Sequence, residues 1–227
     1  MSRTVDRVVA GLAEMEARLP EDDGVRAFAH VYRVVTEQVG QALTEAGTFA
    51  DPTFVERLDV GFAGLFFDAE SAARSGREVP PAWAPLAQAR RRPGVLPIQQ
   101  VLAGMNAHIN HDLAVAVVQT CEQAGRRVDD PDVAADFQGV NDVLARVVRP
   151  IRQTFLDQAV VQAGAPLSPM ADAVSMWSID KARDAAWASA LALWHVRGVP
   201  LVADRMRLSL AHMVGLVSRG LLLPLQP

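Results

Sequence analysis

Polar side chains that could bind a metal or move a proton interrupt an apolar stretch between residues 104 and 113. The segment reads Gly-Met-Asn-Ala-His-Ile-Asn-His-Asp-Leu and lies inside a predicted helix from about Pro97 to Thr120. A helix that served only as core would carry leucine, alanine and valine throughout. These polar residues are therefore the first candidates for chemistry.

Helical spacing sorts the polar residues of this segment into two pairs. At roughly 100° per residue, His108 and Asp112 lie four apart on one flank of an apolar face. Asn106 and Asn110 lie four apart on the other flank, and His111 points nearly opposite, where we expect it to be solvated. A buried polar group without a partner costs roughly 1–3 kcal/mol. The partners must come from other helices or from a ligand.

One interpretation of the segment is a metal site. His108 and Asp112 could reach one ion from the same helix face. Aspartates elsewhere could complete an oxygen-rich shell that would suit Zn, Mn or Fe in a metal-dependent hydrolase. Zinc hydrolases need several more histidines, and this chain has only five in total. The aspartates that could serve are Asp59, Asp136, Asp180 and Asp184.

A second interpretation, which we adopt as the prediction, needs no cofactor. His108 can move a proton near neutral pH while Asp112 orients its ring. The side-chain amides and the only tyrosine could hold a substrate carbonyl, and aromatic walls indicate an apolar metabolite. We expect cyclisation, isomerisation or dehydration of a polyketide-like, terpenoid or acyl molecule. The other side chains expected around this cavity are Tyr32, Phe62, Asn106, Asn110, Asp180, Asp184 and Trp187.

A third interpretation involves no catalysis. The polar pairs would then satisfy one another and fix the helix register, or hold a small ligand. An apolar cavity that reaches His108 would favour an enzyme, whereas an imidazole sealed among packed side chains would favour this third interpretation.

The elements that must position these residues are all predicted to be helices. Apolar residues recur at helical spacing along the chain, and no alternating stretch bounded by hairpin turns indicates a strand. One domain over residues 1–227, an all-α bundle of about seven helices, is the simplest account. A short helix near 83–90 is also expected within the proline-rich connection 76–97. The predicted long helices span 4–18, 24–46, 52–75, 97–120, 131–161, 170–197 and 201–222.

Composition narrows the functional classes further. The chain has 227 residues, half of them apolar, and a formal charge of −4. We expect no nucleic-acid partner, and the short basic run Arg90–Arg92 is predicted to be a solvated loop. The sequence contains no stretch of about 18 apolar residues without a charge, so we expect no membrane span. The charged N-terminus lacks an apolar signal region, so we expect a cytoplasmic protein.

Two further expectations concern the lone cysteine and the assembly. Cys121 is the only cysteine, which excludes an intrachain disulfide and is typical of a small buried hydrophobe. The apolar interhelical surfaces could also support a homodimer. Phosphate-binding loops, the Gly-x-Ser-x-Gly elbow and Cys-x-x-Cys pairs do not occur in the sequence.

Several separated stretches resemble a large bacterial family of uncharacterised all-helical proteins, a domain-of-unknown-function family. The resemblance covers most of the chain, and its most specific part is the Gly-Met-Asn-Ala-His-Ile-Asn-His-Asp-Leu motif. It implies an all-helical fold with a shared polar centre, and it implies no particular reaction. The other stretches that carry it are Phe28–Tyr32 with Val35-Thr36, Leu58–Ala63, Pro81–Trp83, Asp136-Phe137 with Asn141, and Arg183 with Ala186-Trp187.

Overall fold

A computed structural model describes residues 3–144 and 178–224 of the chain. The described residues form α-helices and no strand, which confirms the predicted all-helical bundle. Residues 131–144 are also helical. The rest of the predicted helix 131–161, with Pro150, and the first part of 170–197 lie outside the described residues. The helices are α1 (Arg3–Arg18), α2 (Gly24–Ala42), α3 (Pro52–Ser75), α4 (Ala84–Ala89), α5 (Pro97–Ala107), α6 (Leu113–Ala124), α9 (Ile179–Val196) and α10 (Pro200–Leu221).

Local sequence signals explain where α2 and α3 begin and where α3 ends. The Asp23 side chain accepts a hydrogen bond from the backbone N–H of Val25 at 2.9 Å and so caps α2. Asp51 caps α3 in the same way, and Pro52 occupies the first helical position, where no N–H is needed. The helix ends at Gly76, whose φ of 68° is a conformation that favours glycine. The predicted bounds of α3 are therefore confirmed.

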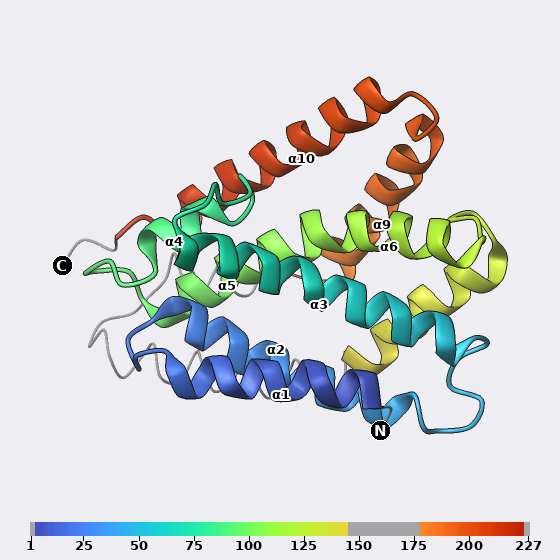
Figure 1. Ribbon diagram of the computed structural model, residues 1–227, viewed down its shortest axis with the longest axis horizontal. Coiled ribbons are helices and arrows are strands. Elements are labelled where there is room, and N and C mark those ends of the chain that lie inside the picture. The colour runs from blue at the N-terminus through green and yellow to red at the C-terminus, as the bar shows by residue number, and fades with distance from the viewer. Residues whose placement is uncertain (1–2, 145–177, 225–227) are drawn as a thin grey trace.

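The central helix passes through the middle of the bundle as α5, a five-residue π-helical turn η1 (His108–Asp112) and α6. Its α5 end packs against α2 and α10, and its α6 end packs against α3 and α9 (Figure 1). Residues 98–118 are buried except for Met105, Ile109 and Asn110, which are half-buried. The helix was predicted to bury one face, whereas it is enclosed on nearly every side.

The π-helical turn carries the polar motif and changes where its side chains point. The backbone N–H of Leu113 donates to the carbonyl of His108, so one turn holds an extra residue. His111 is only 8% exposed, and the prediction that it is solvated is wrong. A regular helical wheel does not apply across this turn, and the enclosed helix offers no solvated side.

Two hydrophobic clusters fill most of the space around the central helix. One contains Phe28, Phe66 and Trp83, and the other contains Phe137 and Cys121. Cys121 is fully buried, as predicted, and burial raises the pKa of its thiol to about 12. Helices α2 and α5 can approach closely because residue 104 in α5 is glycine. An added Cβ there would lie 2.6 Å from the Phe28 ring of α2.

Helices α9 and α10 form a hairpin whose tip extends beyond the rest of the bundle (Figure 1). The inner side of α10 buries Ala203, Ala211 and Val214 against the neighbouring helices. In the part of the chain that the structure describes, no helix is both long enough and apolar enough to cross a membrane.

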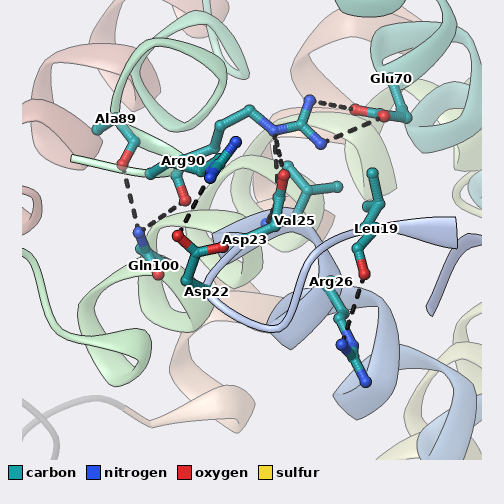
Figure 2. Close-up of polar contacts among 10 residues, drawn as sticks. Leu19, Asp22, Asp23, Val25, Arg26, Glu70, Ala89, Arg90 and Gln100 are labelled. Carbon is teal, nitrogen blue, oxygen red and sulfur yellow. Dashed lines mark hydrogen bonds and ion pairs between the residues drawn. The ribbon is translucent and has the colours of Figure 1, made fainter. Parts of the chain in front are cut away.

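Arg90 ties the connection between α3 and α5 to the body of the bundle, which corrects the prediction of a solvated basic loop. Its Nε lies 2.8 Å from a carboxylate oxygen of Asp23, and its Nη1 lies 3.2 Å from one of Glu70 (Figure 2). Both carboxylates are buried. The Gln100 amide donates to the Arg90 carbonyl at 3.0 Å. Only Arg91 and Arg92 of this run are exposed.

Replacement of Arg90 should therefore destabilise the fold. In Arg90→Ala the buried carboxylates of Asp23 and Glu70 lose the cation that pairs with both of them, and leaving buried charges uncompensated costs on the order of 3 kcal/mol. Chemical denaturation measures this loss directly. Arg91→Ala is the matched control, because Arg91 and its partner Asp22 are both exposed, and it should change stability by less than about 0.5 kcal/mol. Equal effects of the two variants would contradict this role of Arg90.

Candidate functional site

The carboxylate of Asp112 is the polar centre of the bundle. It is 2% exposed and accepts a hydrogen bond from the indole Nε1 of Trp83 at 2.8 Å. The Nδ1 atom of His111 lies 2.7 Å from its Oδ1, and the Nδ1 atom of His108 lies 3.4 Å from its Oδ2. Burial alone would raise the pKa of Asp112, but the hydrogen bonds from the two histidines outweigh it and lower the pKa. The group is therefore ionised.

The imidazole of His108 is held inside an aromatic cage. It stacks on Phe62 with ring centroids 3.5 Å apart and an angle of 6° between the planes, and the Tyr32 ring meets it edge-on at 4.4 Å. Burial lowers the pKa of His108, and Asp112 offsets this only in part, so the ring is neutral at neutral pH. Because a carboxylate only accepts hydrogen bonds, Nδ1 carries the proton and Nε2 carries the lone pair.

His108 also lines an apolar pocket between α2, α3 and the central helix. Within the described residues the pocket has a volume of about 90 Å³, room for more than one water molecule or for the end of a small ligand. Its polar lining consists of Tyr32, Asp59, His108 and Arg183. The apolar side chains that form its walls include Val31, Val35, Leu58, Phe62, Met105 and Ile109.

Three polar atoms that belong to this lining are buried without a hydrogen-bond partner among the described residues. They are the hydroxyl of Tyr32, Oδ2 of Asp59 and Nε2 of His108. A single unpaired buried group costs about 1–3 kcal/mol, so three at one pocket are expensive for the folded chain. Such a cluster indicates a place where the polar atoms of a ligand or of water complete the hydrogen bonding.

Burial shifts the two oxygen acids of the pocket towards their protonated forms. It raises the pKa of Asp59 to about 7, with a smaller contribution from the charge of Glu56. It also raises the pKa of Tyr32 well above its usual value, and the charges of Asp59 and Asp112 add to this effect. The nearby Thr36 hydroxyl lowers that pKa, but it donates its own hydrogen bond to the Tyr32 backbone carbonyl at 2.9 Å.

Arg183 is the one cation among the lining residues named above. Its Nη2 donates to the carbonyl of Phe137 at 2.6 Å, its Nε donates to the side-chain oxygen of Asn141, and the guanidinium lies over the Phe137 ring at 4.3 Å. Burial lowers its pKa to about 10, partly offset by the charges of Asp180 and Asp184. The group is still charged at neutral pH and places positive charge at one wall of the pocket.

The amide pair that was predicted to line the cavity lies elsewhere. Asn106 donates to the carbonyl of Val214 and to the hydroxyl of Ser218, both at 2.9 Å, and Asn110 donates to the Asn106 side-chain oxygen at 3.0 Å. These contacts join the central helix to α10. Neither asparagine lines the pocket, so the prediction that both face the cavity is wrong. Their geometry is that of a satisfied structural network.

The predicted contributions of Asp180, Asp184 and Trp187 to the pocket are also wrong. Both carboxylates are exposed. Neither carboxylate belongs to the buried face of α9, which consists of Ile179, Ala182, Arg183, Ala186, Ala190, Leu193 and Trp194. Trp187 packs on Phe137 with ring centroids 4.6 Å apart and does not line the pocket.

Asp136 has a structural position. Its buried carboxylate accepts hydrogen bonds from the backbone N–H groups of Ala50 at 2.6 Å and Asp51 at 2.8 Å, which fixes the chain before α3. Among residues 3–144 and 178–224, no three histidine, cysteine, aspartate or glutamate side chains gather so that they could hold one metal ion. The aspartates that might have completed a shell around His108 and Asp112 do not do so in this part of the chain.

Of the residues expected around the cavity, Tyr32, Phe62 and His108 line the pocket. Asp59 and Arg183 also line it, although neither was expected there. Asp59 was considered only as a possible metal ligand, and Arg183 only as part of a stretch that resembles the uncharacterised family. The signal for Asp59 was available, because it occupies one stripe of α3 with Val55, Phe62 and Phe66 at spacings of four, three and four. No comparable signal in the sequence identified Arg183.

Comparison with known proteins identifies a family and no activity. The model of a family described as "Family of unknown function (DUF5995)" matches residues 5–224, nearly the whole chain. No curated protein and no solved structure matches this chain. The predicted resemblance to an uncharacterised family is confirmed at this level.

The raised pKa of Asp59 predicts a specific dependence of stability on pH. The folded protein holds this proton up to about pH 7, whereas the unfolded chain releases it near its usual value of 3.8. Between these values the folded state binds more protons, so the wild-type protein loses stability as the pH rises. Asp59→Asn removes this dependence and should gain stability relative to wild type across the window, to a limit of about 4 kcal/mol.

Denaturation of both proteins at about pH 5 and about pH 8 measures this difference. Asp68→Asn is the matched control, because Asp68 is exposed on the same helix. It should show no such trend. A gain for Asp59→Asn that is the same at both pH values would contradict the burial of a protonated carboxyl.

Proposed function

We propose that this chain, which belongs to the family of unknown function DUF5995, is an enzyme that moves a proton on the polar end of an apolar small molecule. One observation carries the proposal. Among the described residues, three buried polar atoms of one apolar pocket, from Tyr32, Asp59 and His108, have no hydrogen-bond partner. Buried titratable groups with shifted pKa values in an apolar pocket are typical of acid–base sites.

His108 takes the role of the general base. Its ring is neutral, its Nδ1–H is directed to the ionised Asp112, and its Nε2, which has no hydrogen-bond partner in the described part of the chain, can accept a proton. When Nε2 accepts a proton, the buried carboxylate stabilises the resulting imidazolium. Asp112 is thus a positioning residue that acts through His108, and Trp83 and His111 hold that carboxylate in place.

Asp59 and Tyr32 take the roles of proton donor and hydrogen-bond donor. A carboxyl with a pKa of about 7 is partly protonated at neutral pH and can donate to a developing oxyanion. The phenol of Tyr32 stays protonated because its pKa is raised, so it can donate a hydrogen bond to the same substrate oxygen. Burial thus gives one pocket a carboxyl acid, Asp59, and a neutral imidazole base, His108.

A carbonyl substrate illustrates the balanced reaction. The C–H bond next to the carbonyl breaks, its proton goes to Nε2 of His108, and the carbonyl oxygen takes the proton of Asp59 to give an enol. In isomerisation the imidazolium returns its proton to a different carbon, and in dehydration it gives that proton to a neighbouring hydroxyl, which leaves as water. In both routes the enol oxygen gives its proton back to the Asp59 carboxylate, which restores the carbonyl. Attack of the enol carbon on an electrophile within the same molecule closes a ring. Each route conserves electrons within the substrate.

Proton exchange tests this function before the natural substrate is known. A series of cyclic and long-chain ketones is first screened for ligands that raise the melting temperature, and each ligand is then incubated with the protein in D₂O. We expect deuterium to enter next to the carbonyl, as detected by NMR. His108→Gln should slow this exchange on the order of 10²- to 10⁴-fold. The rate should also fall above about pH 7, because Asp59 then loses its proton.

His30→Gln is the matched control, because His30 is an exposed histidine that pairs with Glu16 at 3.0 Å. It should exchange at the wild-type rate. If ketones bind without exchange, the protein is a non-catalytic ligand-binding protein. If exchange survives His108→Gln, His108 is not the base of the reaction.

A further inference from the structure

All large hydrophobic side chains that are strongly exposed in the described residues belong to one short part of the chain, between residues 199 and 223. Most of them belong to α10, on the side away from its buried residues Ala203, Ala211 and Val214, and this helix lies at one edge of the bundle (Figure 1). Monomeric proteins seldom gather exposed apolar side chains in this way unless the patch meets a partner. These residues are Val199, Leu201, Val202, Leu208, Met213, Leu216, Val217 and Leu223.

The same face of α10 carries positive charge on a chain whose formal charge is −4. The helix contains three arginines and one acidic residue, Asp204, which pairs with Arg207 at 3.5 Å. Arg205 and Arg219 are exposed, and no ion pair involves them in the part of the chain that the structure describes. The face therefore has uncompensated positive charge.

These arginines and the exposed apolar side chains share one side of the helix. At roughly 100° per residue, Leu201, Arg205, Leu208, Leu216 and Arg219 fall on one side of α10 and are all exposed. A 22-residue helix extends about 33 Å at 1.5 Å per residue. A long helix with an apolar, arginine-bearing outer face is typical of segments that lie in the plane of an anionic membrane surface.

A second copy of the chain fits this face less well. A parallel pair of α10 helices would place Arg205 and Arg219 opposite the same residues of the other copy. An antiparallel pair centred on His212 would place Arg205 opposite Arg219. Either arrangement brings like charges together, which is unfavourable across an interface. Anionic lipid headgroups would instead neutralise both arginines, while the leucines enter the acyl boundary.

We propose that α10 docks on an anionic lipid surface, with its axis in the membrane plane and its outer face towards the bilayer. The proposal is independent of the chemistry of the pocket, since none of the residues that line the pocket belongs to α10. Binding should weaken as salt rises, because the arginine contacts are exposed and therefore screened.

Vesicle flotation with the full chain tests the proposal. We expect the protein to float with vesicles of equal parts phosphatidylcholine and phosphatidylglycerol, and to stay behind with phosphatidylcholine alone. Arg205→Gln combined with Arg219→Gln should weaken binding about 25-fold, at about fivefold for each cation. Leu201→Ser combined with Leu216→Ser should weaken it about tenfold or more. The folded state should survive all four changes, because the replaced side chains are exposed.

Arg3→Gln combined with Arg7→Gln is the matched control, because it removes the same charge from the exposed surface of α1. It should leave binding unchanged, and circular dichroism verifies that every variant is folded. Several outcomes would overturn the proposal. They are no flotation with either vesicle, equal flotation with both, an equal loss in the α1 control, or a wild-type dimer in sedimentation that Leu216→Ser converts to a monomer.

Discussion

One buried negative charge, the carboxylate of Asp112, constrains the rest of the polar centre. It is enclosed by apolar side chains and would be very costly without partners, so three separate groups turn towards it. Trp83 brings in the connection that precedes α4, and the two histidines bring in the wide turn of the central helix. The orientation and the tautomer of His108 follow from this arrangement. Since that ring also forms part of the pocket wall, the shape of the pocket depends on the same charge.

A single physical cause, exclusion of water, gives the groups of the pocket their different properties. Burial lowers the pKa of the imidazole and raises that of the carboxyl and the phenol, so all three lean towards their uncharged forms near neutral pH. Arg183 keeps its charge because its pKa, although lowered by burial, stays at about 10 with support from the charges of Asp180 and Asp184. The result is a cavity with apolar walls and hydrogen-bonding groups of both kinds, which suits an apolar molecule with one oxygen function.

The sequence predicted the helical class, most helix bounds and the aromatic neighbours of His108, because these depend on periodicity and capping within one segment. It failed where the answer depended on packing between segments. The buried state of His111 requires the π-helical turn and a helix enclosed on nearly every side, and neither is visible in a helical wheel. Asn106 and Asp180 were assigned to the cavity by their residue type, although one bonds to α10 and the other faces solvent. The ion pairs of Arg90 join residues that are far apart in the chain, so local composition suggested only a solvated loop.

The wide turn at residues 108–112 also determines how the chain responds to a change in its length. Deleting one residue there would let the backbone close as an ordinary α-helix, with its hydrogen bonds preserved. Because the wide turn holds one more residue than an α-helical turn over about the same rotation, α6 would keep its orientation and its buried valines would still face α3 and α9. The change would fall on the polar motif, whose side chains would have one position fewer on that turn. The extra residue therefore serves the polar centre and not the packing of α6.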